Sequence, residues 1–311
     1  MPHGLACCHR RNPYLTQIKP SPFDAYIGPA RPKSQLWRLL VGCLLCLVIY
    51  VGFVGVLFGL LVVMQGIDQA ALLARELAEA NTPTAALALL FTFAGMALGP
   101  IITVRLLHKR SAASLFGPRA RVFRDFAIAA GTVGLIYGLA MVYWSTRYDA
   151  VPQLNVMLWL SFLPLAIVAL LIQTGAEELV FRGYLMQQLA ARFRSPLIWM
   201  VLPSVVFGAV HFDPTTGGDN VWLIIAAAGL FGLVAADLTA VTGSIGAAWG
   251  FHFANNFAAL LIVAVDGTIP GLALYLTPYG AQDIATLRPL ILLDLLALAI
   301  AWFLVRRILR R

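Results

Sequence analysis

The sequence predicts an all-α fold, a polytopic bundle of about eight transmembrane helices, and three observations support this. Of the 311 residues, 60% are hydrophobic and only 12% are charged, whereas soluble domains contain about 25% charged residues. The mean hydropathy is +0.85, and the apolar residues form runs long enough to cross a bilayer. The positive charges gather between these runs and in the tails, as signals of membrane topology do. The net charge of +8 therefore does not indicate a nucleic-acid partner.

Residues 1–36 are polar, basic and rich in proline, and we interpret them as a disordered cytoplasmic tail. The apolar run from Leu36 to Met64 follows this tail. It is much longer than the roughly 7–15 residues of the apolar region of a secretory signal peptide, so we expect it to be the first span. Gly55 and Gly59 lie one turn apart on this run, and we interpret the pair as a helix-packing face.

Seven further apolar runs follow, and the charges of the loops give their orientation. The loop at 105–124 is the most basic, and arginines also close the chain, so both are expected in the cytoplasm. The loops at 65–83, 213–220 and 266–288 have no positive excess and are expected outside. This topology predicts a multi-pass protein of the plasma (inner) membrane with both termini cytoplasmic. We expect the remaining spans at about residues 84–104, 126–144, 155–178, 196–212, 221–238, 245–265 and 290–305.

Three ionisable residues stand at the end of the fourth run, after the uncharged stretch from Leu154 to Thr174. A charge at bilayer depth costs roughly 2.5–3.5 kcal/mol on insertion scales. Three charged residues so close together in a span therefore indicate a structural or functional role. In a helix, Glu178 and Arg182 lie at i and i+4, the favourable order for an ion pair. Glu177 points about 100° away from that pair. We therefore expect one glutamate to be held by the arginine and the other to be free. A cytoplasmic helix end, where charges also collect, is the alternative.

Two histidines lie inside or at the end of later spans, and intramembrane ionisable residues indicate function by default. His211 ends the fifth run, in the stretch Phe207–His211. His252 lies on the seventh run, and Asn256 follows one turn later on the same helix face. A single histidine on an apolar helix is more often a packing residue, but two histidines, an asparagine and a free glutamate on three spans together indicate a site.

These groups supply the two functions that peptide hydrolysis needs. Glu177 and His211 can hold and deprotonate a water molecule, and His252 and Asn256 can donate hydrogen bonds to the oxyanion of a tetrahedral intermediate. The same carboxylate and imidazoles, Glu177, His211 and His252, can also bind a divalent metal such as Zn²⁺, which activates water in a different way. The residues alone leave both mechanisms open.

Other functions fit the sequence less well. It contains no His-Glu-x-x-His motif of a zincin and no Gly-x-Gly-Asp motif, and nothing marks Ser244 as an activated nucleophile. A transporter or proton relay would also use Glu and His in its spans, but we find no inverted repeat. Asp237 and Asp294 lie in or near spans, and we interpret them as interfacial or packing residues. A membrane-embedded binding or immunity protein with the same fold and no proteolytic activity is a further alternative.

The residues in three motifs resemble those of the CPBP family, which comprises CAAX-processing endopeptidases and bacteriocin-processing or immunity-related membrane proteases. The three motifs occur in the family's order, over about residues 155–265. They are Glu177-Glu178-x-x-x-Arg182, Phe207-x-x-x-His211 and His252-x-x-x-Asn256. Any one of them is weak, whereas all three in order on apolar segments form a strong signal.

The resemblance implies an all-helical intramembrane protease of the type II CAAX prenyl endopeptidase kind, acting on a membrane-embedded or lipid-anchored protein or peptide. In such a protease Glu177 and His211 activate the water, His252 and Asn256 form the oxyanion site, and Glu178 and Arg182 support them. The family is usually called a metalloprotease. Together with the composition and the expected spans, the resemblance predicts four parts: a tail (1–36), N-terminal transmembrane helices (37–150), a catalytic core (151–265), and an outer loop with the last helix (266–311).

Simple hydropathy places Glu177 near the inner membrane surface and His211 near the outer one. The two residues can come to a similar depth if the helix continues to about Arg192, because Glu177 to Arg192 then spans roughly 22 Å at 1.5 Å per residue. We therefore expect a helix to Arg192. The apolar run from Leu154 to Gln173 is then a longer, kinked or additional segment.

Overall fold

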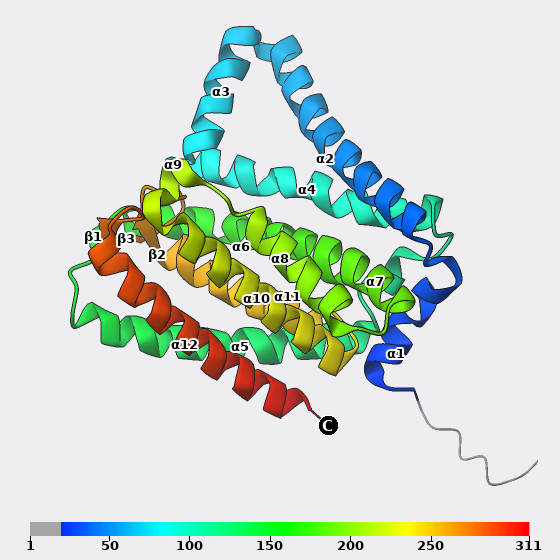
Figure 1. Ribbon diagram of the computed structural model, residues 1–311. Helices are drawn as coiled ribbons and strands as arrows, with labels where there is room; N and C mark the ends of the chain where they lie inside the picture. Colours follow the sequence, from blue (N-terminus) through cyan, green and yellow to red (C-terminus); the bar gives the residue numbers. More distant parts are fainter. Residues whose placement is uncertain (1–19, 311) are drawn as a thin grey trace, which may run out of the picture.

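The computed structural model describes residues 20–310 of the chain, and it is a bundle of long helices with one small sheet at its edge (Figure 1). Each of the eight predicted spans corresponds to a helical segment. The first six of these segments are α2 (Leu36–Gln65), α4 (Pro83–Leu106), α5 (Arg119–Ser145), α6 with α7 (Val156–Glu178 and Gln187–Arg192), α8 (Leu202–Ala209) and α10 (Val221–Thr242). The last two are α11 (Gly246–Phe257) and α12 (Ile284–Leu309).

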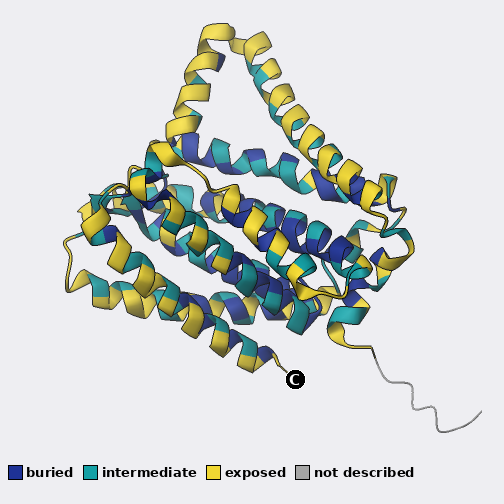
Figure 2. Ribbon diagram, viewed as in Figure 1, coloured by how far each residue is buried: buried dark blue, intermediate teal, exposed yellow. Residues whose placement is uncertain are grey.

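Six helices within residues 20–310 are long and apolar enough to cross a membrane. The helix over Leu197–Ala209 is apolar but shorter, and α11 has 12 residues. The exposed residues of the long helices are largely apolar (Figure 2), as expected for surfaces that face lipid. The chain is a multi-pass membrane protein, as its composition predicts.

The expected continuation of the fourth span to Arg192 is confirmed. The helix runs from Val156 to Arg192, with a π-helical segment from Leu179 to Met186 between α6 and α7. The apolar run that precedes the glutamates is therefore the first part of this one helix and not an additional segment. π-Helical turns are rare and occur frequently at functional sites, and this one starts directly after Glu178.

Helix α11 lies in the middle of the bundle because its small residues allow close approach. A Cβ atom on Gly246 would overlap the carbonyl oxygen of Val122, and one on Gly250 would overlap that of Phe126, both on α5. On α6, a Cβ on Gly175 would lie 3.0 Å from the ring of Trp249. Small residues at such crossings are the usual way in which membrane helices pack. They place α11 against α5 and α6, next to the glutamates.

We expect the substitution Gly250→Val to abolish accumulation of folded protein, because the added side chain must displace backbone and not a flexible side chain. The measurement is the amount of monodisperse protein after extraction in detergent. Gly138→Val on α5 is the matched control, since a Cβ atom on Gly138 would have no atom of the described chain within 4 Å. An equal yield of the two variants would contradict this account of the packing.

The prediction of disorder for the N-terminal tail is wrong for residues 22–33, and residues 1–19 lie outside the described residues. Helix α1 (Pro22–Ile27) and a 3₁₀ segment (Gly28–Lys33) precede α2. Tyr26 is buried, and its hydroxyl donates to the carbonyl oxygen of Leu115 at 2.7 Å. The proline-rich composition hides the fact that Tyr26 and Ile27 bury apolar surface against the bundle.

Two segments predicted as loops are also ordered. Residues 65–83 contain the helix α3 (Ile67–Glu79), which with α2 forms the exposed hairpin at the top of Figure 1. In the 266–288 region, β3 (Tyr275–Gly280) pairs antiparallel with β1 (Val151–Pro152) and parallel with β2 (Val263–Asp266). The sheet joins residues on both sides of the predicted domain boundary at 265, and the four-part division stays a prediction.

The expected packing face at Gly55 and Gly59 makes no contact within the described chain. No atom lies within 4 Å of a Cβ atom built on either residue. The upper part of α2 is exposed along its length (Figure 2), and only Leu39 and Gly42 of this helix are buried. One hydrophobic core cluster lies among α5, α8, α10, α11 and α12, and a second joins the start of α2 to α1 and α4.

Candidate active site

The ion pair expected between Glu178 and Arg182 forms in the centre of the bundle. Nη1 of Arg182 lies 3.0 Å from Oε1 of Glu178, and the two side chains are 2% and 0% exposed. The same carboxylate oxygen lies 2.9 Å from Nδ1 of His252. Arg182 also donates to the carbonyl oxygen of Gly232 at 3.2 Å and lies 4.8 Å from the centre of the Phe207 ring. Glu178 thus links α11 to the π-helical segment through Oε1, while its buried Oε2 has no hydrogen-bond partner among the described residues.

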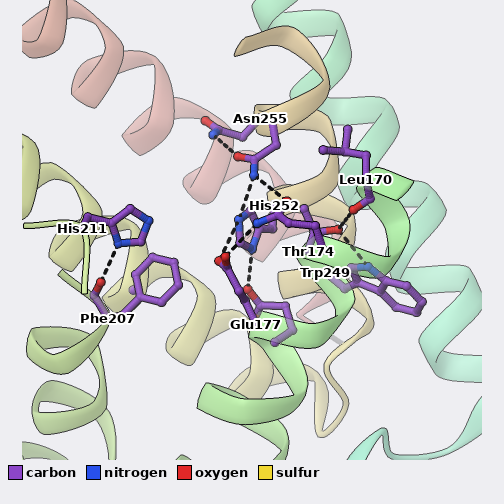
Figure 3. A network of polar contacts seen from close by, with 12 residues as sticks. Leu170, Thr174, Glu177, Phe207, His211, Trp249, His252 and Asn255 are labelled. Atoms are coloured by element: carbon purple, nitrogen blue, oxygen red, sulfur yellow. Dashed lines mark hydrogen bonds and ion pairs between the residues drawn. The ribbon is translucent and has the colours of Figure 1, made fainter. Parts of the chain in front are cut away.

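Glu177 has a different environment, as its position one residue earlier predicts. Its side chain is 12% exposed, and within residues 20–310 no lysine or arginine pairs with it. Oε1 accepts a hydrogen bond from Nε2 of Gln173 at 2.7 Å, and Oε2 lies 3.6 Å from Nε2 of His252. Figure 3 shows Glu177 pointing toward the His252 ring. Glu177 is therefore the carboxylate of this pair that remains available for chemistry.

His252 and Asn256 share one face of α11, as their spacing predicts. Nδ2 of Asn256 lies 3.3 Å from Nε2 of His252 and donates to Oε1 of Gln173 at 3.0 Å. Because Nδ1 of His252 faces the Glu178 carboxylate, Nδ1 carries a proton. Nε2 of His252 and the amide of Asn256 therefore both face the region of Glu177.

His211 is the one predicted site residue that the structure does not bring into contact with the others. It is exposed at the end of α8, and its ring lies 4.9 Å from that of Phe207, which in turn lies 6.1 Å from that of His252. Figure 3 shows His211 across the Phe207 ring from the cluster. Nδ1 of His211 donates to the carbonyl oxygen of Phe207 at 2.7 Å. That bond leaves Nε2 with a free lone pair.

The residues that were candidate metal ligands, Glu177, His211 and His252, do not form a metal site as they are arranged. No group of three or more His, Cys, Asp or Glu side chains within residues 20–310 is placed to hold a metal ion. Among the described residues, His211 contacts neither of the other two candidate ligands. The donor set does not fit a bound metal, so no step below is routed through one.

Sequence reasoning missed two residues that hold the cluster together. Gln173 is buried and bridges Glu177 to Asn256. Its position one turn before Glu177, as a polar residue late in an otherwise apolar run, is a signal that could have identified it. Phe207 is buried between Arg182, His211 and His252, but an aromatic residue on an apolar helix gives no such signal.

Residues 155–258 match the model of the family described as type II CAAX prenyl endopeptidase Rce1-like. This segment is similar to that family. The match confirms the resemblance predicted from the three motifs, and the matched residues include every predicted site residue as well as Gln173 and Phe207. The Rce1-like segment covers about a third of the chain and includes α6, α8, α10 and α11, the helices that carry or cover the cluster.

A relative from Bacillus subtilis (strain 168), described as uncharacterized protein YyaK, is similar over a longer stretch. It is 27% identical to this chain over an alignment of 268 residues, and the alignment covers 80% of this chain and 86% of that protein. No solved structure matches the chain significantly. The similarity to the relative thus extends beyond the Rce1-like segment into neighbouring helices.

Proposed function

We propose that the protein is an intramembrane endopeptidase that hydrolyses a peptide bond of a membrane-embedded or lipid-anchored protein or peptide. The observation that carries this proposal is the contrast between the two adjacent glutamates. Glu178 is fully buried and held by Arg182 and His252. Glu177 is partly exposed, and the imidazole of His252, 3.6 Å away, is the one basic side chain that faces it among residues 20–310. The match to an endopeptidase family supports the same reaction class.

Glu177 and His211 hold and deprotonate the attacking water. Glu177 offers a carboxylate oxygen, and His211 offers the lone pair on Nε2 that its bond to the Phe207 carbonyl leaves free. Glu177 takes the proton from the water and later gives it to the leaving amine, so the proton balance closes within one turnover. A positioned general base contributes roughly 10²–10⁴ in rate.

His252 and Asn256 bind the oxyanion that forms when the water attacks. Their side-chain nitrogens, Nε2 and Nδ2, lie 3.3 Å apart, close enough to donate to one oxygen once Nε2 carries a proton. Glu178 fixes the orientation of the His252 ring through Nδ1 and stabilises positive charge on it. Removal of one such donor costs about 10²–10³ in kcat.

The location of the cluster restricts the substrates. The site residues lie on helices of a multi-pass membrane protein, so a substrate must itself cross the membrane or be held at it by a lipid anchor. The protein lies in the plasma membrane with both termini in the cytoplasm. This orientation is supported by the basic loop at 105–124 and by the arginines at the end of α12, because positive charges collect on the cytoplasmic side.

The experiment that tests the assigned roles compares wild type with His211→Ala and Asn256→Ala on one membrane-anchored peptide that the protein cleaves. We expect kcat to fall by roughly 10²–10⁴ for His211→Ala and by about 10²–10³ for Asn256→Ala, with KM nearly unchanged. A variant with full kcat would remove that residue from the mechanism. Cleavage of an otherwise identical peptide without its lipid shows which kind of anchor the substrate needs.

We expect cleavage to persist in the presence of a metal chelator, because the candidate donors within residues 20–310 do not come together as a metal site. The measurement is the rate on the same peptide after dialysis against the chelator, with the Asn256→Ala variant as a low-activity reference. Loss of cleavage that Zn²⁺ restores would contradict this prediction and would return the three candidate ligands to a metal-binding role.

A further inference from the structure

A chain of side-chain hydrogen bonds begins at Glu177 and crosses two helices. Nε2 of Gln173 donates to Glu177 at 2.7 Å, and Nδ2 of Asn256 donates to Oε1 of Gln173 at 3.0 Å. Nδ2 of Asn255 then donates to Oδ1 of Asn256 at 3.1 Å. Each amide thus donates toward Glu177 and accepts from the side chain behind it. The three amides form a chain with one direction, and a carboxylate is its acceptor.

The chain continues through Tyr137 of α5 to Asp294 of α12. The Tyr137 hydroxyl oxygen lies 3.0 Å from Oδ1 of Asn255 and 2.9 Å from Oδ1 of Asp294. Asp294 is exposed at the edge of the bundle, and within residues 20–310 its side chain has no other hydrogen bond and no ion pair. We call the whole set the amide chain, consisting of Glu177, Gln173, Asn256, Asn255, Tyr137 and Asp294.

Counting protons shows that the two ends of the amide chain depend on each other. A phenol has one proton, and both neighbours of the Tyr137 hydroxyl present oxygen atoms. If Tyr137 donates to Asn255, the contact to Asp294 is a hydrogen bond only when Asp294 carries a proton and donates it to Tyr137. In the structure the hydrogen bonds of the amide chain point toward Glu177. All of these hydrogen bonds can form at once when Asp294 is protonated and Glu177 is ionised.

All hydrogen bonds of the amide chain can also form in the opposite direction, with the donors pointing toward Asp294. An amide has nearly the same shape after a rotation of 180°, which exchanges its donor and acceptor. In the reversed chain Tyr137 donates to an ionised Asp294, and each amide donates toward Tyr137. The oxygen of Gln173 then faces Glu177, so Glu177 must carry a proton to complete the last hydrogen bond. When both carboxyl groups are ionised, two acceptors face each other at one junction. Asp294 lies within the membrane-spanning helix α12, so its exposed side faces lipid and not water, and an acceptor left there without a partner costs about 1–3 kcal/mol.

We propose that Asp294 and Tyr137 are positioning residues that set the direction of the Asn256 amide, with a protonated Asp294 favouring the active direction. The proposal rests on the proposed function, in which Asn256 must present its N–H group to the oxyanion. In the direction of the structure, Nδ2 of Asn256 faces Nε2 of His252. In the reversed direction the amide oxygen faces it, and an oxygen cannot stabilise an oxyanion. Asp294, although it lies on another helix, thus controls a group at the site.

Several other ionisable groups on α12 and on the elements packed against it have partners of their own. On α10, Asp237 is paired with Arg306 at 2.7 Å. On α12 itself, Nε of Arg288 donates to Asn220. The ring of Tyr279 on β3 packs against that of Tyr148. Among the described contacts, Tyr137 is the one titratable partner of Asp294, so ionisation of Asp294 acts on the amide chain.

The kinetic test is the pH profile of Asp294→Asn. Asparagine cannot ionise, and its Nδ2 can donate to Tyr137 at every pH, so the amide chain stays in the active direction. We expect wild-type kcat to fall at alkaline pH by up to the roughly 10²–10³ that an oxyanion donor contributes, and kcat of Asp294→Asn to fall less, with KM unchanged in both. In a Tyr137→Phe background the same substitution should have no effect. Identical pH profiles of wild type and Asp294→Asn would overturn the proposal.

A second measurement does not depend on catalysis. Infrared spectroscopy of the purified protein in detergent detects the carbonyl stretch of a protonated carboxyl group. We expect a component of this band at neutral pH that disappears in Asp294→Asn and remains in Glu177→Gln and in the control Asp237→Asn. A band that disappears in Glu177→Gln and remains in Asp294→Asn would place the proton at the other end and overturn the proposal. This result stands or fails separately from the proposed protease activity.

Discussion

Replacement of Glu177 by glutamine is expected to abolish cleavage while the protein stays folded. Glutamine keeps the shape of the side chain and can still accept the hydrogen bond from Gln173, but it cannot take a proton from water. Since the general base and the later proton donor are lost together, kcat should fall by roughly 10³ or more. KM should change little, because Glu177 acts mainly on the reacting atoms.

The measurement is the rate of cleavage of one membrane-anchored peptide by each purified protein, together with the thermal stability of each in detergent. Asp237→Asn is the matched control, because it makes the same change from carboxylate to amide at a pair with Arg306 outside the cluster. We expect the control to keep most of its activity. Full activity of Glu177→Gln would show that another group activates the water.

Replacement of Glu178 by alanine is expected to lower the stability of the protein strongly. The change leaves the Arg182 guanidinium, 2% exposed, without its carboxylate, and it removes the partner of Nδ1 of His252. Breaking a buried ion pair by removing one partner costs about 3–5 kcal/mol. This is a large part of the roughly 5–15 kcal/mol by which proteins are stable, so the main result should be a low yield of folded protein.

The control for this prediction is Asp237→Ala, which breaks an ion pair whose side chains are 20% and 25% exposed. Because water still reaches Arg306, its loss of stability should be much smaller. The thermal unfolding midpoint in detergent is measured for both variants. Equal midpoints for Glu178→Ala and wild type would show that the buried pair does not hold α11 against the π-helical segment.

The parts of the site that lie within one helix could be predicted from the sequence. The Glu178–Arg182 pair and the His252–Asn256 face follow from the i, i+4 geometry of a helix, and the continuation to Arg192 follows from its rise per residue. These predictions need no knowledge of which helices touch. For the same reason the contrast between Glu177 and Glu178 was visible in the sequence alone.

Contacts between helices could not be predicted in the same way. The bond from Asn256 to Gln173 joins residues 83 positions apart, and that from Tyr137 to Asn255 joins residues 118 positions apart. Neutral polar side chains in apolar runs have no charge to mark them, and one sequence does not indicate which of them meet. The continuation of the helix to Arg192 predicts a similar membrane depth for Glu177 and His211. It does not predict whether the two side chains are in contact, and in the structure they are not.

Ordered segments in polar or loop-like regions were missed for a different reason. Prolines and charges around Tyr26 are typical of a tail, and the burial of that one ring decides the structure there. The strand Tyr275–Gly280 gains its hydrogen bonds from β1 and β2. Strand β1 lies four spans earlier in the chain, and β2 follows directly after the seventh span. Local composition does not contain that information.

The central claim is that the cluster around Glu177 hydrolyses peptide bonds, and the most direct test is a cleavage assay with a library of membrane-anchored peptides. Purified wild type and Glu177→Ala are incubated with the library in ¹⁸O-labelled water, and the products are identified by mass spectrometry. We predict products with ¹⁸O in the new carboxyl terminus for wild type and none for the variant. Equal cleavage by both proteins would contradict the mechanism. Peptides bound but left intact by both would contradict the protease assignment and indicate a membrane-embedded binding protein with this fold.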